Sequence, residues 1–157
     1  GNIVGKVLPG TGVMVLAAND VHIYENTIQN NKSIGTGIVS YFITEEAFTD
    51  SLYNPYTSDI HIYNNVYNRE AGLPTLDYEI GQLMAIKYGR NTPDIIYDGM
   101  QDPDDAEGLC IQNNFRANFT NLDIEYNFEK WYSPFLSNFS EDPSPHDCGI
   151  PHLSTLK

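Results

Sequence analysis

A seven-residue pattern that occurs twice restricts the fold of this chain more than any other feature. Residues 20–26 read DVHIYEN and residues 59–65 read DIHIYNN. Apolar and polar residues alternate in both copies, as they do in a half-buried β-strand. A strand of this length cannot bury an apolar face alone, whereas parallel copies stacked on one another can. The pattern therefore predicts parallel strands whose apolar residues, including Ile23 and Ile62, share one interior.

A second, glycine-led pattern is interleaved with the first. Residues 10–15 read GTGVMV and residues 35–40 read GTGIVS. Each repeat is thus expected to hold a glycine-led strand, a turn, and an alternating strand that ends in Asn or Gly. Weaker echoes follow, of the glycine-led pattern at 81–86 and 108–112 and of the seven-residue pattern at 94–99 and 122–127.

The ordered recurrence of both patterns predicts an all-β fold, a right-handed parallel β-helix (solenoid) of about four rungs. The corner residues Asn26 and Asn65 are expected to form a ladder in which each amide bonds to the next rung. We expect residues 1–130 to form the rungs, incomplete at the N-terminal end. Residues 131–157 contain four prolines, and we expect them to form an extended C-terminal cap over the last rung. The rungs themselves are expected at 10–34, 35–80, 81–107 and 108–130.

The charge balance excludes one class of partner. The chain carries 21 Asp and Glu against 8 Lys and Arg, which gives a net charge of −13. The eight cations do not cluster, so a nucleic acid is not expected as a partner. No apolar run approaches the roughly 20 residues that cross a bilayer, and we expect no membrane span.

The two cysteines bear on the cellular compartment. Cys110 and Cys148 are too far apart in the sequence for a CxxC redox or metal motif. In an acidic chain rich in Tyr and Asn, an even pair favours an exported protein with one structural disulfide. Two unrelated buried thiols are the alternative.

Five short segments of the chain stand out together: GNIV at 1–4, PGTGV at 9–13, VHIYENTI at 21–28, VSY at 39–41, and Cys110 with CGIP at 148–151. They resemble one bacterial family, the exported parallel β-helix repeat-containing proteins, in a branch similar to periplasmic mannuronan C-5 epimerases. The resemblance implies the C-terminal portion of a longer member and an extracellular or periplasmic location.

The sequence offers little for catalysis. An epimerase or lyase that acts on uronic acids needs a cation beside the substrate carboxylate and a general base. The Asp-Pro-His motif of the related epimerases is absent, and the nearest string, PHD at 145–147, has the wrong order. We therefore expect an exported module that binds carbohydrate or protein or serves as an assembly scaffold, without a catalytic centre of its own. The alternative is part of a uronate epimerase or lyase whose catalytic rungs lie upstream of Gly1.

Aromatic side chains are the leading candidates for a binding site. His22 and His61 occupy equivalent outward positions, and Tyr24 and Tyr63 lie two residues further along. Stacked imidazoles can bind a transition metal and stacked tyrosines can bind a sugar, but a ladder of like side chains also stabilises any sheet. The loop tyrosines Tyr53 and Tyr56 could stack on sugar rings or form a lid over the sheet.

An acidic loop is a weak candidate for Ca²⁺, and no other cofactor is expected. Carboxylates at this density can supply the six to eight oxygen ligands that Ca²⁺ takes, although the spacing is not that of an EF-hand. A solvated run of charge with local turns is the alternative. The loop contains Asp98, Asp102, Asp104, Asp105 and Glu107.

The N-terminal edge of the predicted rungs would be exposed. Residues 1–5 resemble the end of an earlier coil, and no amphipathic cap precedes residues 10–12. Apolar residues such as Val13 and Val15 would then lie at an open edge beside unpaired strand N–H and C=O groups. We expect upstream rungs or a partner subunit to cover this edge.

Overall fold

The described strands of this protein form three separate sheets, and within each sheet every pair of neighbouring strands is parallel. The computed structural model describes residues 7–104, 108–127 and 138–149. One sheet has the order β1-β4-β7-β9, the second β2-β5-β8 and the third β3-β6. The strands are β1 (Thr11–Leu16), β2 (Asn19–Tyr24), β3 (Thr27–Gln29), β4 (Ile34–Val39), β5 (Ser58–Tyr63), β6 (Val66–Asn68), β7 (Ile95–Tyr97), β8 (Leu109–Gln112) and β9 (Phe119–Asn121).

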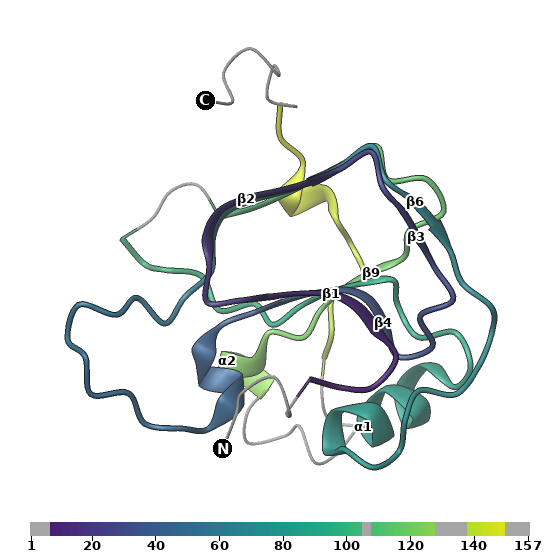
Figure 1. Ribbon diagram of the computed structural model, residues 1–157, viewed down its shortest axis with the longest axis horizontal. Coiled ribbons are helices and arrows are strands. Elements are labelled where there is room, and N and C mark those ends of the chain that lie inside the picture. Colours follow the sequence, from purple (N-terminus) through teal and green to yellow (C-terminus); the bar gives the residue numbers. More distant parts are fainter. Residues whose placement is uncertain (1–6, 105–107, 128–137, 150–157) are drawn as a thin grey trace.

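The chain passes through the three sheets in turn, and the sheets surround the main apolar core (Figure 1). Each sheet supplies buried side chains to this core, among them Val15, Ile23, Ile38, Tyr67 and Ile95. The long loops and the helices lie outside it, as Figure 1 also shows.

The pairing of the two seven-residue copies is confirmed. Strands β2 and β5 are parallel, with Val21 beside Ile60, His22 beside His61 and Ile23 beside Ile62. The alternation of the sequence places the isoleucines inside and the imidazoles outside, as a period of two requires.

The expected alignment of the glycine-led patterns is wrong. Val13 lies beside Thr36 rather than beside Ile38, which places Gly12 next to Gly35. A steric constraint accompanies this register, because a Cβ on Gly12 would come within 2.7 Å of the carbonyl oxygen of Gly35 and 2.5 Å of Nδ2 of Asn31. Glycine at position 12 therefore permits the close approach of β1 and β4.

The prediction of an all-β right-handed parallel β-helix of about four rungs is wrong as well. Over the described residues the structure is mixed α/β, with three separate parallel sheets and two α-helices, α1 (Glu79–Tyr88) and α2 (Ile124–Asn127). Two short 3₁₀ helices, η2 (Tyr41–Thr44) and η3 (Ser144–His146), complete the described elements.

Helix α1 occupies the segment in which a glycine-led strand was expected. Its sequence, EIGQLMAIKY, contains mostly strong helix formers, and Gly89 ends it with a φ of +60° and an N–H that donates to the carbonyl of Ala85. Leu83 and Met84 are buried against the outer face of β4 and β7. Because α1 and α2 cover that face, both strands are buried on two sides, as strands of an α/β protein are.

The later echoes were assigned to the wrong strands. The segment expected to repeat the seven-residue pattern at 94–99 contains β7, which pairs with β4. The segment expected to repeat the glycine-led pattern at 108–112 contains β8, which pairs with β5. The echo at 122–127 contains α2. Such short similarities do not distinguish one sheet from another.

A ladder of three asparagines joins successive strands at the corner after β2, β5 and β8. The Oδ1 atom of Asn65 accepts hydrogen bonds from the backbone N–H and the Nδ2 of Asn26, at 3.0 and 3.1 Å. Asn114 accepts in the same way from Asn65, at 3.2 and 2.9 Å. The buried amide of Asn65 also donates to the carbonyl of Ile23. The expected ladder is therefore confirmed and extends to a third residue.

The fold makes a prediction for Ile62. We expect Ile62→Ala to lower the free energy of unfolding by about 2–5 kcal/mol, because the side chain is 0% exposed and its loss leaves a cavity. Val66→Ala is the matched control, since Val66 is 39% exposed. Urea unfolding at pH 7 measures both changes, and a cost for Ile62→Ala no larger than that of the control would contradict the register.

Candidate functional site

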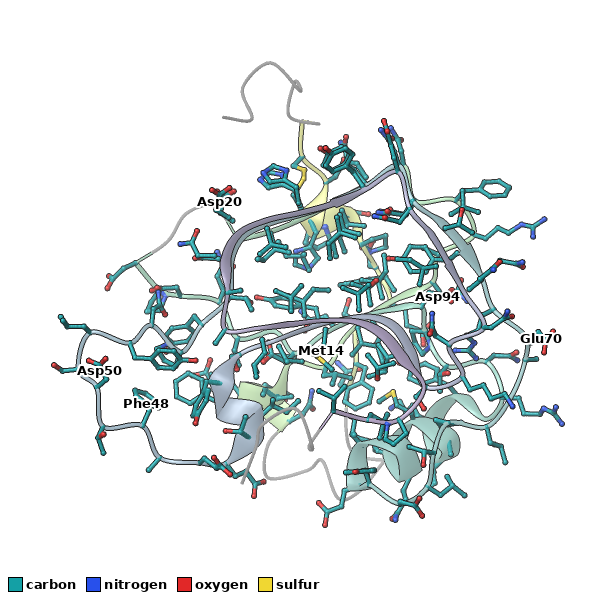
Figure 2. The ribbon with its side chains drawn as sticks, in the orientation of Figure 1. Met14, Asp20, Phe48, Asp50, Glu70 and Asp94 are labelled. Atoms are coloured by element: carbon teal, nitrogen blue, oxygen red, sulfur yellow. A yellow bond between two sulfur atoms is a disulfide. The ribbon has the colours of Figure 1, made fainter. Side chains whose placement is uncertain are left out.

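Two columns of side chains run across the outer face of the β2-β5-β8 sheet. His22, His61 and Cys110 are neighbours in one column, because the strands pair in that register. Tyr24 and Tyr63 continue into Gln112 in the second column. Figure 2 shows Asp20 at the start of this face, on the side of the sheet that points away from the core.

The rings of each column are stacked. The ring centroids of His22 and His61 are 4.6 Å apart with an angle of 2° between the planes. Those of Tyr24 and Tyr63 are 5.1 Å apart, also at 2°. These separations follow from the strand spacing of about 4.8 Å in a sheet. The structure therefore brings together the four ring residues that the sequence singled out for this face.

Two aspartates with positive φ, at the second position of β2 and of β5, flank the imidazoles. Asp20 has a φ of 57° and Asp59 a φ of 49°, a conformation that Asp tolerates better than most residues. The Asp59 carboxylate lies 2.7 Å from Nε2 of His61, whereas Asp20 lies 3.6 Å from Nε2 of His22. The Nδ1 atoms of both histidines are buried and have no hydrogen-bond partner among the described residues.

The disulfide between Cys110 and Cys148 is present as predicted, with 5.6 Å between the Cα atoms. It brings a second sulfur to the histidine column, and one ligand atom each from His61, Cys110 and Cys148 lies within 4.8 Å of the others. The sequence did not predict this cluster, because 108–112 was aligned with the glycine-led pattern. Alignment of 109–112 with 60–63 would have placed Cys110 next to His61.

A recess of about 520 Å³ lies beside the disulfide. The His146 ring forms part of it and also packs edge-on against Tyr97 and Phe119, at centroid distances of 5.6 and 5.3 Å. Burial lowers the pKa of His146, and a hydrogen bond with the backbone of Leu109 opposes that shift. Other lining residues include His61, Gln101, Cys110, Asp147 and Cys148.

The loop tyrosines belong to a different part of the molecule. Tyr53 packs edge-on against Tyr41 and Phe48, and Tyr56 packs edge-on against Phe42. Figure 2 shows Phe48 in the long loop that projects from the sheets, away from the labelled Asp20. The structure therefore does not bring Tyr53 and Tyr56 to the histidine and tyrosine columns, and their roles in sugar binding or as a lid stay predictions.

The acidic loop divides into a buried and an exposed part. Asp98 is 0% exposed, and it accepts hydrogen bonds from the backbone N–H and the hydroxyl of Ser40, both at 2.6 Å, and from the N–H of Met100. Burial raises the pKa of Asp98, while these hydrogen bonds lower it. Asp102 accepts from the backbone N–H of Asp104 and from Asn54.

Two of the five proposed Ca²⁺ ligands, Asp105 and Glu107, lie outside the described residues. Within the described part of the chain, the one group of three or more His, Cys, Asp or Glu side chains that converges on a common point is the His61, Cys110 and Cys148 cluster. Ca²⁺ binding by the loop stays a prediction.

The chain was compared with known proteins once this geometry was in hand. No family model matches it, and neither a curated protein nor a solved structure is found to be similar. Among the described helices, none has the length and apolarity needed to cross a membrane.

Protonation of His146 gives a prediction for stability. Because burial lowers its pKa below the ordinary 6.5, the neutral form contributes its full stability above pH 6.5, and that stability is lost as the pH falls through the lower folded pKa. We expect the stability of the wild type relative to His146→Gln to decrease from pH 7 to pH 5. Urea unfolding at both pH values measures the difference, and a difference that does not change would contradict the buried neutral imidazole.

Proposed function

We propose that this protein is an exported binding module, without its own catalytic centre, that accepts polypeptide strands at the open end of its three sheets. Strands β1, β2 and β3 are the edge strands of their sheets, and they follow one another directly in the chain. No other strand among the described residues pairs with their outer sides. Unpaired edges of this kind are templates for further strands.

The opposite end of the sheets has a different environment. Ser140 forms an antiparallel bridge with Asn121 of β9, and the disulfide of Cys148 ties the C-terminal segment to β8. Segment 138–149 therefore covers that end and leaves it less available to added strands. The proposal therefore assigns strand addition to the end at β1, β2 and β3.

The asparagine ladder is the observation that carries the proposal. The Oδ1 atoms of Asn65 and Asn114 each accept two hydrogen bonds from the asparagine of the preceding strand. Asn26 is the first member, and within the described part of the chain nothing donates to its Oδ1. Its Nδ2 donates to the carbonyl of Tyr24, in its own segment, whereas the Nδ2 of Asn65 donates to the preceding strand. A parallel strand added beside β2 would complete the ladder.

Partly buried apolar residues and a half-stacked tyrosine ring also favour strand addition at the end formed by β1 and β2. Val13 and Val21 are only partly buried at the open end, whereas Ile60 and Ile95, one strand or two further along, are at most 1% exposed. An added strand would remove more of this apolar surface from water, which is favourable. The ring of Tyr24 is stacked on Tyr63 on one side, so an incoming aromatic residue could stack on the other.

The proposed location is extracellular or periplasmic. Disulfides form and persist in oxidising compartments and are rare in the cytosol. The disulfide between Cys110 and Cys148 supports export on this ground.

A peptide that continues the ladder tests the proposal. The probe is a synthetic peptide with the sequence of residues 58–65, SDIHIYNN. In the protein this segment contains β5, which pairs with the side of β2 that faces the rest of the sheet. We expect it to slow hydrogen exchange of the β2 amides. Asn26→Leu removes the acceptor of two hydrogen bonds, each worth about 0.5–1.5 kcal/mol, and should weaken binding roughly tenfold.

The matched control is Asn68→Leu, which makes the same change at an exposed position of β6, the strand that pairs with β3. This variant should bind the peptide as the wild type does. Protection of β8 or β9 in place of β2, or equal affinities for the two variants, would rule out strand addition at the open end.

Binding of a neutral saccharide is a second candidate. The recess beside the disulfide favours it, because imidazole, amide and carboxylate groups there can bind sugar hydroxyls. The net charge of −13 disfavours a uronate polymer. Calorimetry with neutral and uronate oligosaccharides is the test. We expect Asp147→Asn, but not Asp142→Asn in the same segment, to weaken binding of the neutral sugars; no heat from any neutral sugar would exclude this candidate.

A further inference from the structure

The cluster of His61, Cys110 and Cys148 has the composition of a metal site. One nitrogen and two sulfurs lie within 4.8 Å of one another, and they come from β5, β8 and the segment that follows η3. Imidazole nitrogen and thiolate sulfur are the donors that Zn²⁺ prefers in proteins. Strand register and the C-terminal segment, rather than a local sequence motif, bring them together.

The imidazole of His61 is already arranged as a metal ligand. The Asp59 carboxylate, 2.7 Å from Nε2, favours the tautomer in which Nε2 carries the proton and donates. Nδ1 then carries the lone pair, and this atom is buried and without a partner among the described residues. A histidine that donates its second ring N–H to a carboxylate is the usual arrangement around protein-bound metals.

The sulfurs are unavailable only because they are bonded to each other. Cys110 is buried, whereas Cys148 is half-buried at the recess of about 520 Å³. The recess gives a reductant access to the disulfide and leaves room for a water molecule as a fourth ligand. Zinc bonds of about 2.3 Å to sulfur and about 2.0 Å to nitrogen place tetrahedral ligand atoms about 3.5–3.8 Å apart. The two sulfurs must therefore move apart once their bond is broken, while the imidazole nitrogen, within 4.8 Å of both, moves closer.

We propose that reduction of the Cys110–Cys148 disulfide converts this cluster into a Zn²⁺ site formed by Nδ1 of His61 and the two thiolates. In the reduction, a small-molecule dithiol gives up two electrons and two protons and forms a disulfide of its own. The bond between the two Sγ atoms breaks, and each Sγ takes one proton. Zn²⁺ binding then releases these two protons as the two zinc–sulfur bonds form.

His22 is a matched control for His61. It also has an aspartate beside Nε2 and an unpartnered, buried Nδ1. Its strand, however, lies on the other side of β5 from Cys110, so the ring of His61 stands between His22 and the sulfurs. The proposal therefore requires His61 and does not require His22.

Co²⁺ is the probe, because its tetrahedral thiolate complexes absorb in the near-ultraviolet and visible. The protein is reduced with the dithiol, freed of it without air, and titrated. We expect the reduced protein to bind one Co²⁺ per chain with release of two protons. One Zn²⁺ should then displace the Co²⁺ without further proton release, and the oxidised protein should bind neither ion. Asp59→Asn should weaken binding about 10–100-fold, His61→Gln at least as much, and His22→Gln not measurably.

Several results would overturn the proposal. They are a reduced chain that binds no Co²⁺, an oxidised chain that binds it equally well, and equal effects of His61→Gln and His22→Gln. Far-UV circular dichroism monitors the fold throughout. A reduced chain that loses its structure and does not regain it with Zn²⁺ would count against the site in the same way.

Discussion

The in-register parallel pairing of β2 with β5 and β8 is the interaction on which the rest of the structure depends. It places Ile23 and Ile62 in the core and, on the opposite face, aligns the two imidazoles with Cys110. A slip of one residue would exchange the two faces and expose the core. The buried amide of Asn65 opposes such a slip, because its hydrogen bonds are satisfied in one register only.

The sequence predicted this pairing because two copies of a seven-residue pattern agree at nearly every position. The alignment of strands from the sequence was wrong where it depended on two glycines or on a short apolar run. The pairing of Gly12 with Gly35 brings two backbones close together, which no pattern of polarity records. Helix α1 was missed because its burial depends on the outer face of β4 and β7, a surface that exists only after the sheets have formed.

The candidate site, too, could be predicted from the sequence only in part. The stacked rings were predictable, since equal positions in paired strands become neighbours. The place of Cys110 beside His61 was not, because Leu109–Gln112 shares only an alternation of apolar residues with β5. Asp98 was also misjudged from the sequence. Its charge suggested an exposed Ca²⁺ ligand, whereas its buried carboxylate accepts hydrogen bonds from the backbone N–H and the hydroxyl of Ser40.

The disulfide links the covered end of the sheets to the histidine column. It closes a loop with a sequence separation of 38 residues, and the chain-entropy model gives such a cross-link about 4 kcal/mol. Reduction alone would remove this restraint from segment 138–149. A metal ion held by the same two sulfurs would restore a cross-link between the same two points of the chain. The covered end would then persist in both oxidation states, and the proposed strand addition beside β1, β2 and β3 would not depend on the disulfide.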